Sequence, residues 1–159
     1  MKSIFIICLT ILTTSIISQT KTFNLSDSIL VVGQEYITRQ IYFDLGKATL
    51  KPESKAVLDS LVMFINLNKK LKLEIGVHSD SRTNPNCCDK PTENRARSIA
   101  QYLIDQSISP DRIVAKGYGA SKLLIKDEQI NKVKTKAEKE VLHALNRRIV
   151  FKIIEQQQK

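Results

Sequence analysis

The sequence has few cysteines, and their positions exclude the commonest structural uses of this residue. Of its three cysteines, Cys8 lies in an apolar N-terminal segment, and Cys87 and Cys88 are adjacent. An isolated Cys-Cys pair lacks the spacing of a structural zinc site, and neighbouring cysteines form only a strained disulfide with each other. We therefore predict no metal site. A redox function, a disulfide to another chain and two loop thiols without a specific role all remain open for this pair.

The sequence also lacks the patterns that catalysis and nucleic-acid binding usually require. It has two histidines, and no serine or cysteine nucleophile falls in an evident triad. Its 25 Lys and Arg exceed its 16 Asp and Glu, but the basic residues are scattered among acidic ones, as in KDEQINKVKTKAEKE. We predict a protein that is not an enzyme, has no cofactor and binds no nucleic acid. The net charge of +9 still permits a membrane surface or an acidic cell-wall polymer as partner.

No hydrophobic run is long enough for a comfortable membrane span of about 20 residues. The N-terminal segment MKSIFIICLTILTTSIISQT begins with Lys2 and is apolar as far as Ile17. This pattern predicts a secretory signal peptide at residues 1–18, cleaved after Ser18. A short uncleaved anchor is the alternative. The bulky residues before Cys8 argue against a lipid attached there. The segment alone predicts an exported protein.

The remaining sequence predicts one α/β (α+β) domain, because strand and helix patterns alternate along it. Residues 19–37 form a lead-in segment, residues 38–154 the domain and residues 155–159 a polar tail. The predicted order is β-α-β-α-β-α-β, and we expect a mixed sheet, with an antiparallel last strand and helices packed on it. Strands are predicted at 36–46, 71–78, 111–119 and 146–154, and helices at 51–70, 92–106 and 133–145, with Thr92 as an N-cap.

Two charged residues stand at a junction that favours ligand binding. Asp80 follows the strand LKLEIGVH, at the edge where open α/β sheets collect ligands. Arg95 is predicted in the first turn of the next helix, where a cation opposes the helix dipole unless an anion shares the site. A carboxylate and a guanidinium side by side would hold a group that carries both an ammonium and a carboxylate. A simple ion pair between Asp80 and Arg95 is the alternative.

Five segments in order give the chain a resemblance to a known family. They are IYFDLGKATLKPESKAVLDSL, EIGVHSDS, RARSIAQYL, DRIVAKGYGASK and NRRIVFKI. Together they resemble the OmpA-like C-terminal domain, the peptidoglycan-associating module of Gram-negative envelope proteins, over residues 38–154. The resemblance implies non-covalent binding of the diaminopimelate-containing peptide stem of peptidoglycan, which would anchor an envelope protein or assembly to the cell wall. Together with the predicted export, it also implies a location in the periplasm, associated with the outer membrane or cell wall.

The resemblance also implies a set of ligand-binding residues. It assigns the acid to Asp80 and the arginine to Arg95, and Ser79 replaces the threonine that precedes the acid in the family. The arginine of the family's final NRR motif matches Arg147 or Arg148, of which we place Arg147 near the pocket. Asn146 is expected to organise that turn, and Asp44 is expected to border the site.

Two other functions remain possible on this scaffold. Residues 81–91 depart from the family's usual loop, so the domain could instead bind another outer-membrane or periplasmic protein after losing the wall ligand. A periplasmic hydrolase that uses Asp80 and His78 is the third hypothesis. Loss of sacculus binding would favour the interaction domain, and muropeptide turnover that disappears in Asp80→Asn would favour the hydrolase.

Overall fold

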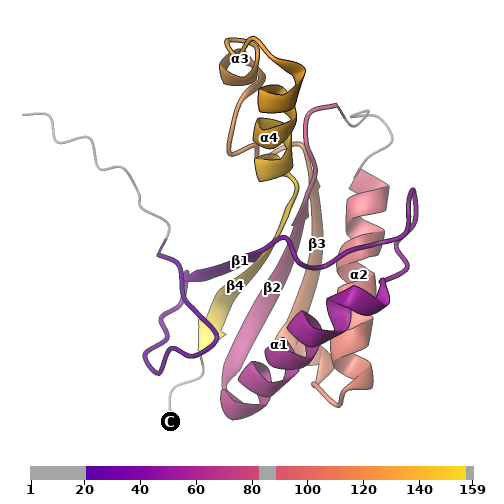
Figure 1. Ribbon diagram of the computed structural model, residues 1–159. Coiled ribbons are helices and arrows are strands. Elements are labelled where there is room, and N and C mark those ends of the chain that lie inside the picture. The colour runs from indigo at the N-terminus through magenta and orange to yellow at the C-terminus, as the bar shows by residue number, and fades with distance from the viewer. Residues whose placement is uncertain (1–20, 83–88, 157–159) are drawn as a thin grey trace, which may run out of the picture.

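The computed structural model describes residues 21–82 and 89–156, so the predicted signal peptide and Cys87–Cys88 lie outside the described residues. Its strands are β1 (Glu35–Thr38), β2 (Leu71–His78), β3 (Ile113–Gly119) and β4 (Arg148–Gln156). Its helices are α1 (Lys55–Leu67), α2 (Asp89–Asp105), α3 (Asp127–Ile130) and α4 (Lys136–Asn146), with 3₁₀ turns at Pro52–Ser54 and Pro110–Arg112. The predicted alternation of strands and helices is confirmed, with the short helix α3 in addition (Figure 1).

The sheet is mixed, as predicted, with the strand order β1-β4-β2-β3. Strands β2 and β3 are parallel, and β4 runs antiparallel to both β1 and β2. The register between β2 and β4 pairs His78 with Arg148. The residues that follow β2 and those that precede β4 therefore meet at one end of the sheet, which places Asp80 near Arg147.

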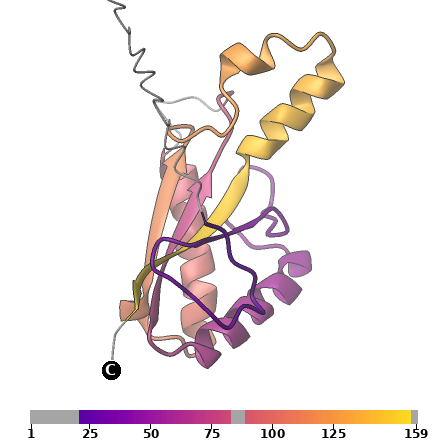
Figure 2. The ribbon, with the colours of Figure 1, turned by 90° about the vertical axis from the view of Figure 1, so that its left-hand side faces the viewer.

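Helices α1 and α2 lie on the same face of the sheet and bury the apolar side of its strands (Figures 1 and 2). The alternation in LKLEIGVH explains why one face of β2 is apolar. The inward side chains of β2 are at most 3% exposed; they are Leu71, Leu73, Ile75 and Val77. They share the core with Leu61 and Phe64 of α1 and Ile99 and Leu103 of α2. The lead-in segment also contributes to the core, through Phe23 and Leu30.

Helix α2 begins at Asp89, earlier than the sequence predicted. Thr92 is therefore not the N-cap. It lies inside the helix with 2% of its surface exposed, and its Oγ1 accepts a hydrogen bond of 3.1 Å from the Gly119 N–H. Because of the earlier start, Arg95 lies in the second turn and not in the first. Strand β3 approaches this helix closely at Gly117, where a Cβ would lie 2.3 Å from the Glu93 nitrogen.

Strand β1 ends at Thr38, so the prediction of a strand as far as Gly46 was wrong. The chain leaves the sheet after Thr38, because its backbone groups find partners in the segment before α1. The Tyr42 N–H donates to Ser54 Oγ at 2.8 Å, and the Lys51 N–H donates to the Tyr42 carbonyl at 3.0 Å. An isolated β-bridge pairs Phe43 with Leu50 within this segment. Residues 39–53 thus form a loop that crosses one end of the sheet.

Helices α3 and α4 form a unit that projects beyond the end of the sheet (Figures 1 and 2). Helix α4 has the N-cap that the predicted helix at 133–145 lacked, because Thr135 accepts a bond of 3.2 Å from the Glu138 N–H. In the described residues, no helix has the length and apolar character needed to cross a membrane.

Candidate ligand-binding site

Asp80 is a buried carboxylate held by two arginines. It follows β2 directly, and 5% of its surface is exposed. Its Oδ2 lies 2.6 Å from Nη1 of Arg147, the residue between α4 and β4. The same oxygen lies 2.8 Å from Nη2 of Arg82, and Oδ1 accepts a bond of 3.1 Å from the Arg82 backbone N–H. The sequence predicted Arg147 near the site but not Arg82.

Glu140 of α4 contacts both arginines, so that these three side chains and Asp80 form a network of four charges. Its carboxylate lies 2.8 Å from Nη1 of Arg82 and 2.7 Å from Nη2 of Arg147. Each of the two arginines therefore contacts both carboxylates. The network ties the projecting helix α4 to the end of β2.

The network keeps Asp80 ionised. Burial of the carboxyl raises its pKa, but the hydrogen bonds from Arg82 and Arg147 outweigh this effect and hold the pKa at about 2. The pKa of Glu140 is lowered by its hydrogen bonds to the same two arginines. Both carboxylates are therefore charged at neutral pH, and Asp80 can attract a cation.

Arg95 lies apart from this network. Its Nε donates a hydrogen bond of 3.1 Å to the Lys47 carbonyl, and its guanidinium carbon lies 5.0 Å from the centre of the Phe43 ring. Among the described residues it forms no ion pair with an acidic side chain, so the structure does not contain the simple Asp80–Arg95 pair. Burial lowers the pKa of Arg95, because no carboxylate offsets the loss of water.

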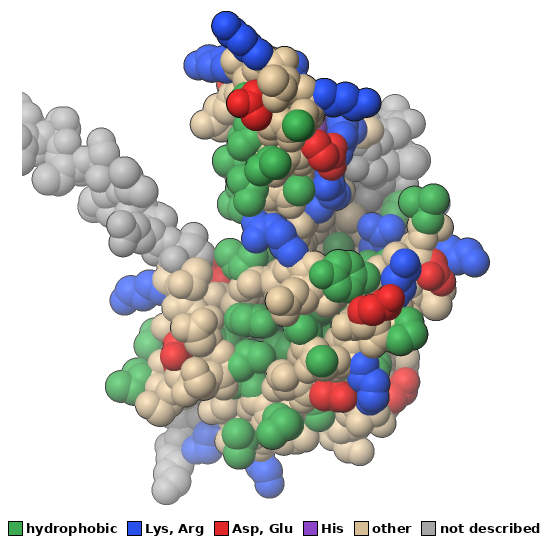
Figure 3. Space-filling view, in the orientation of Figure 1, with side chains coloured by type: hydrophobic (Ala, Val, Ile, Leu, Met, Phe, Trp, Pro, Cys, Tyr) green, Lys and Arg blue, Asp and Glu red, His purple; other side chains and the backbone are tan. Residues whose placement is uncertain are grey.

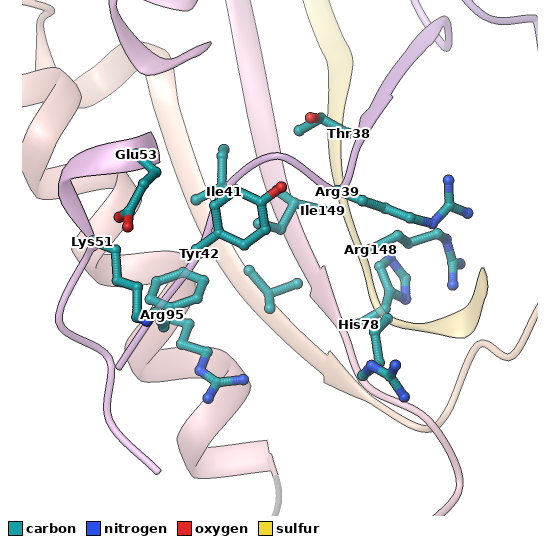
Figure 4. A pocket seen from close by; sticks show the side chains of 13 residues that line it. Thr38, Arg39, Ile41, Tyr42, Lys51, Glu53, His78, Arg95, Arg148 and Ile149 are labelled. Atoms are coloured by element: carbon teal, nitrogen blue, oxygen red, sulfur yellow. The ribbon is translucent and has the colours of Figure 1, made fainter. Parts of the chain in front are cut away.

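Arg95 and Arg147 both line a cavity of about 690 Å³ under the 39–53 loop (Figure 4). Five cationic side chains line it: Arg39, Lys51, Arg95, Arg147 and Arg148. Of the described residues that line the cavity, Glu53 is the only acidic one, and Asp80 contacts Arg147 without lining the cavity. In Figure 4, Arg95, Lys51 and Glu53 lie on one side of the cavity and Arg39, Arg148 and His78 on the other. The arrangement favours anionic ligand groups.

Three other predicted site residues do not line the cavity. Asn146 is fully buried, and its Oδ1 accepts bonds from the Leu124 and Ile125 N–H groups at 2.8 and 2.9 Å, so it organises this turn and its amide has no free surface. Asp44 begins the tight turn that its backbone makes with Lys47 and Thr49. The hydroxyl of Ser79 is buried without a hydrogen-bond partner.

The comparison with known proteins places this geometry in a family. The sequence profile of the OmpA family matches residues 42–137, which is more than half of the chain. The chain belongs to the OmpA family. The matched range of this OmpA-family domain includes Asp80, Arg82 and Arg95, whereas Arg39, Glu140 and Arg147 lie outside it.

Curated relatives are similar to the chain over part of their length. Outer membrane protein A of Escherichia coli O157:H7 is 34% identical over 105 residues, which cover 65% of this chain and 27% of that protein. Outer membrane protein P5 of Haemophilus influenzae is 31% identical over 83 residues, which cover 52% of this chain and 24% of that protein. The OmpA-family chain thus matches about a quarter of the length of these relatives.

Solved structures share the fold at low sequence identity. A putative MotB-like protein from Desulfovibrio vulgaris superposes with a TM-score of 0.61 and 17% identity, over 82% of this chain and 78% of that one. The cell wall anchor of the T6SS from Pseudomonas aeruginosa gives 0.60 and 16%, over 77% and 81%. The peptidoglycan-associated lipoprotein from Burkholderia pseudomallei gives 0.56 and 17%, over 70% and 86%.

The sequence predictions missed Arg82, Glu140 and Arg39. Arg82 carried a local signal, since it lies two residues after Asp80 in the sequence. Glu140 and Arg39 carried none, because α4 and the 39–53 loop reach the end of the sheet only in the folded chain.

Proposed function

We propose that this chain binds peptidoglycan without covalent attachment and so anchors an envelope protein or assembly to the cell wall. The proposal rests on the cavity, which is lined by both Arg95 of α2 and Arg147. Its cationic side chains can donate to an anionic group, and Arg147 contacts the buried, ionised carboxylate of Asp80. The names of the structural neighbours, a cell wall anchor and a peptidoglycan-associated lipoprotein, support a wall ligand. The outer-membrane names of the curated relatives support a location in the cell envelope.

In this proposal the ligand group is the free end of diaminopimelate, which carries a carboxylate and an ammonium on one carbon. Arg95 receives the carboxylate, because its guanidinium has Nη donors that no acidic side chain of the described residues occupies. The ammonium approaches Asp80. It shares this carboxylate with Arg147 and Arg82, or displaces them toward Glu140, which already accepts a bond from each.

The proposed binding requires no chemistry on the ligand, so we infer a binding domain and not an enzyme. His78, a candidate in the hydrolase hypothesis, has its pKa lowered to about 3 by burial and by the charges of Arg148 and Lys122. A histidine with this pKa is neutral at physiological pH and is a poor match for general acid–base catalysis, which favours a pKa near the working pH.

Co-sedimentation with purified diaminopimelate-type sacculi tests the proposal. The protein should sediment at low and moderate salt, and Arg95→Ala should lose binding at both. Arg97→Ala is the matched control, because Arg97 lies on the same helix, pairs with Glu93 at 3.1 Å and does not line the cavity.

Both variants lose one positive charge, so general attraction to an acidic polymer would weaken equally in the two and would fade with salt. Equal loss in both variants contradicts a specific site. Absence of binding in the unaltered protein rejects the proposal and favours the interaction-domain hypothesis. Lys and Arg side chains over the α3–α4 unit and along its junction with the sheet make the salt comparison necessary (Figure 3).

A further inference from the structure

The side of the cavity opposite Arg95 is a second cluster of positive charge. Arg39 follows β1, and Arg148 and His78 face each other across the β2–β4 pair. All three line the cavity and lie together on one side of it (Figure 4). Arg148 and His78 are each 7% exposed, so these groups have lost most of their contact with water.

The groups that contact Arg39 and Arg148 carry too little negative charge to balance the two guanidiniums. Arg39 Nη2 donates to the Leu145 carbonyl at 3.0 Å, and Arg148 Nη1 donates to the Asn146 carbonyl at 3.2 Å. These carbonyls are at the C-terminal end of α4, which supplies about half a negative charge against two guanidiniums. Neither arginine has a carboxylate within 4.0 Å in the described part of the chain. Burial lowers the pKa of Arg148, and the charge of Arg39 lowers it further, although Glu35 acts in the opposite direction. The two guanidiniums therefore lie close enough to repel each other.

His78 provides an independent sign that a ligand group belongs here. Its Nδ1 is buried and has no hydrogen-bond partner among the residues that the structure describes, although the great majority of buried polar atoms have one. The ring cannot turn freely, because it stacks on Tyr118 at a centroid distance of 4.8 Å. A buried, unpartnered nitrogen beside two arginines in the wall of a cavity is suited to a polar group that enters from outside.

We propose that Arg39, Arg148 and His78 form a second anion subsite, which binds another carboxylate of the ligand whose first carboxylate Arg95 holds. The inference rests on the proposed function and narrows its ligand to stems that carry at least two carboxylates. We assign the anion as a carboxylate because the proposed wall ligand presents carboxylates. Arg39 and Arg148 donate three hydrogen bonds to backbone carbonyls and keep seven N–H groups with which to hold it.

NMR titration of the purified protein with small probes tests the subsite. The probes are a series of straight-chain dicarboxylates of increasing length, each beside the monocarboxylate of the same length. At the length that spans the cavity, the dicarboxylate should bind about tenfold more tightly than its monocarboxylate, as one additional charge-assisted hydrogen-bonded contact gives. Arg39→Gln should remove this gain and leave in place the chemical-shift changes that a monocarboxylate causes around Arg95, whereas Arg95→Gln should remove those changes.

Arg39 is the residue to vary, because it is exposed and its loss should leave the fold intact, and Arg97→Gln is the charge-matched control. A gain that persists in Arg39→Gln, or dicarboxylates that bind no better than monocarboxylates at any length, overturns the subsite. Inorganic phosphate that displaces the second carboxylate at lower concentration than acetate overturns the assignment to a carboxylate.

The sacculus assay keeps this inference separate from the proposed function. Arg39→Gln should weaken sedimentation with sacculi, whereas Arg95→Ala should abolish it. Sacculus binding that is fully retained in Arg39→Gln rejects the subsite and leaves the wall-binding proposal standing. If the unaltered protein does not bind sacculi, the wall ligand is rejected, and the probe titrations alone still decide whether the two anion subsites exist.

Discussion

Nη1 of Arg147 lies 2.6 Å from Oδ2 of Asp80, although 67 residues separate them in the sequence. The antiparallel pairing of β2 with β4 makes this contact possible, because it places the end of one strand beside the start of the other. Arg82 approaches the same carboxylate from the adjacent loop, and Glu140 contacts both arginines from α4. Three separate parts of the chain are thus joined through one buried charge.

We expect Arg82 and Arg147 to be coupled in stability. Arg82→Ala or Arg147→Ala alone leaves Asp80 with one guanidinium and should cost about 1 kcal/mol, since both arginines are half exposed. The double variant leaves the buried carboxylate with neither, and should cost at least about 2 kcal/mol more than the sum of the two single effects. Urea unfolding of the four proteins measures the coupling. Additive costs would mean that the two arginines stabilise Asp80 independently of each other.

Acid should destabilise the protein in two stages. The pKa of His78 is about 3 against an ordinary 6.5, because burial and the charges of Arg148 and Lys122 disfavour its charged form. Below pH 6.5 the imidazole of His78 therefore binds a proton in the unfolded chain but not in the folded chain. The free energy of unfolding keeps its full value above pH 6.5 and decreases as the pH falls toward 3, by up to about 1.4 kcal/mol per pH unit. Urea unfolding between pH 7 and 4.5 should show a shallower pH dependence in His78→Gln, and an unchanged slope would contradict the assignment.

The second stage belongs to Asp80. Its pKa of about 2, against an ordinary 3.8, means that its contribution to stability is present above pH 3.8 and is lost as the pH falls toward 2. The contribution amounts to no more than about 2 kcal/mol. Asp80→Asn should remove the dependence below pH 4 and leave the slope between pH 7 and 4.5 intact, which is the opposite of the His78→Gln pattern.

The sequence predicted the regular parts of the fold because their hydrophobic period is clear. The strict alternation in β2 and the three- and four-residue spacing in α1 gave elements whose type was correct. The errors lie where backbone partners come from distant residues. β1 was predicted too long, because Tyr42 bonds to Lys51 and Ser54 and not to β4. α2 was predicted too short, because its first turn has the composition of a loop.

The candidate site was predicted in part for a related reason. Asp80 and Arg95 stand at positions that the strand and helix patterns identify, so local sequence was enough to select these two residues as candidates. Local sequence was not enough to predict which charged side chains contact each other. Whether a carboxylate pairs with Arg95, Arg82 or Arg147 depends on the start of α2, on the 39–53 loop and on the placement of α4. None of these is determined by spacing along the chain.

Gly117 should tolerate no side chain. A Cβ at this position would lie 2.3 Å from the backbone nitrogen of Glu93 and 2.7 Å from Oγ1 of Thr92, so α2 would have to move away from β3. Gly117→Ala should cost about 3 kcal/mol in the free energy of unfolding. At Gly76 the nearest atom is the Tyr118 ring at 3.0 Å, which can shift, so Gly76→Ala should cost about 1 kcal/mol. Equal costs in chemical denaturation would mean that the α2–β3 contact can relax.

Variants of Asn146 can show whether this residue supports the fold or contacts the ligand. The sequence placed it among the ligand-binding residues, whereas its buried amide accepts two hydrogen bonds from the Leu124 and Ile125 N–H groups and donates one of 2.8 Å to the Ile125 carbonyl. Asn146→Ala should lower the free energy of unfolding by about 3 kcal/mol, because three part-buried hydrogen bonds to backbone groups are lost. Asn146→Asp keeps both acceptor bonds but places a buried carboxylate oxygen against the Ile125 carbonyl, so it should cost at least as much.

Binding distinguishes the two roles for Asn146. When both variants are assayed at a temperature where they are fully folded, their affinity for sacculi should stay within about threefold of the unaltered protein, because the side chain has no surface to offer a ligand. Arg147→Ala, one residue further along, should lose far more, since Arg147 lines the cavity. A tenfold loss of affinity in folded Asn146→Ala would mean that the amide turns toward the ligand when it binds, and Asn146 would then return to the set of contact residues.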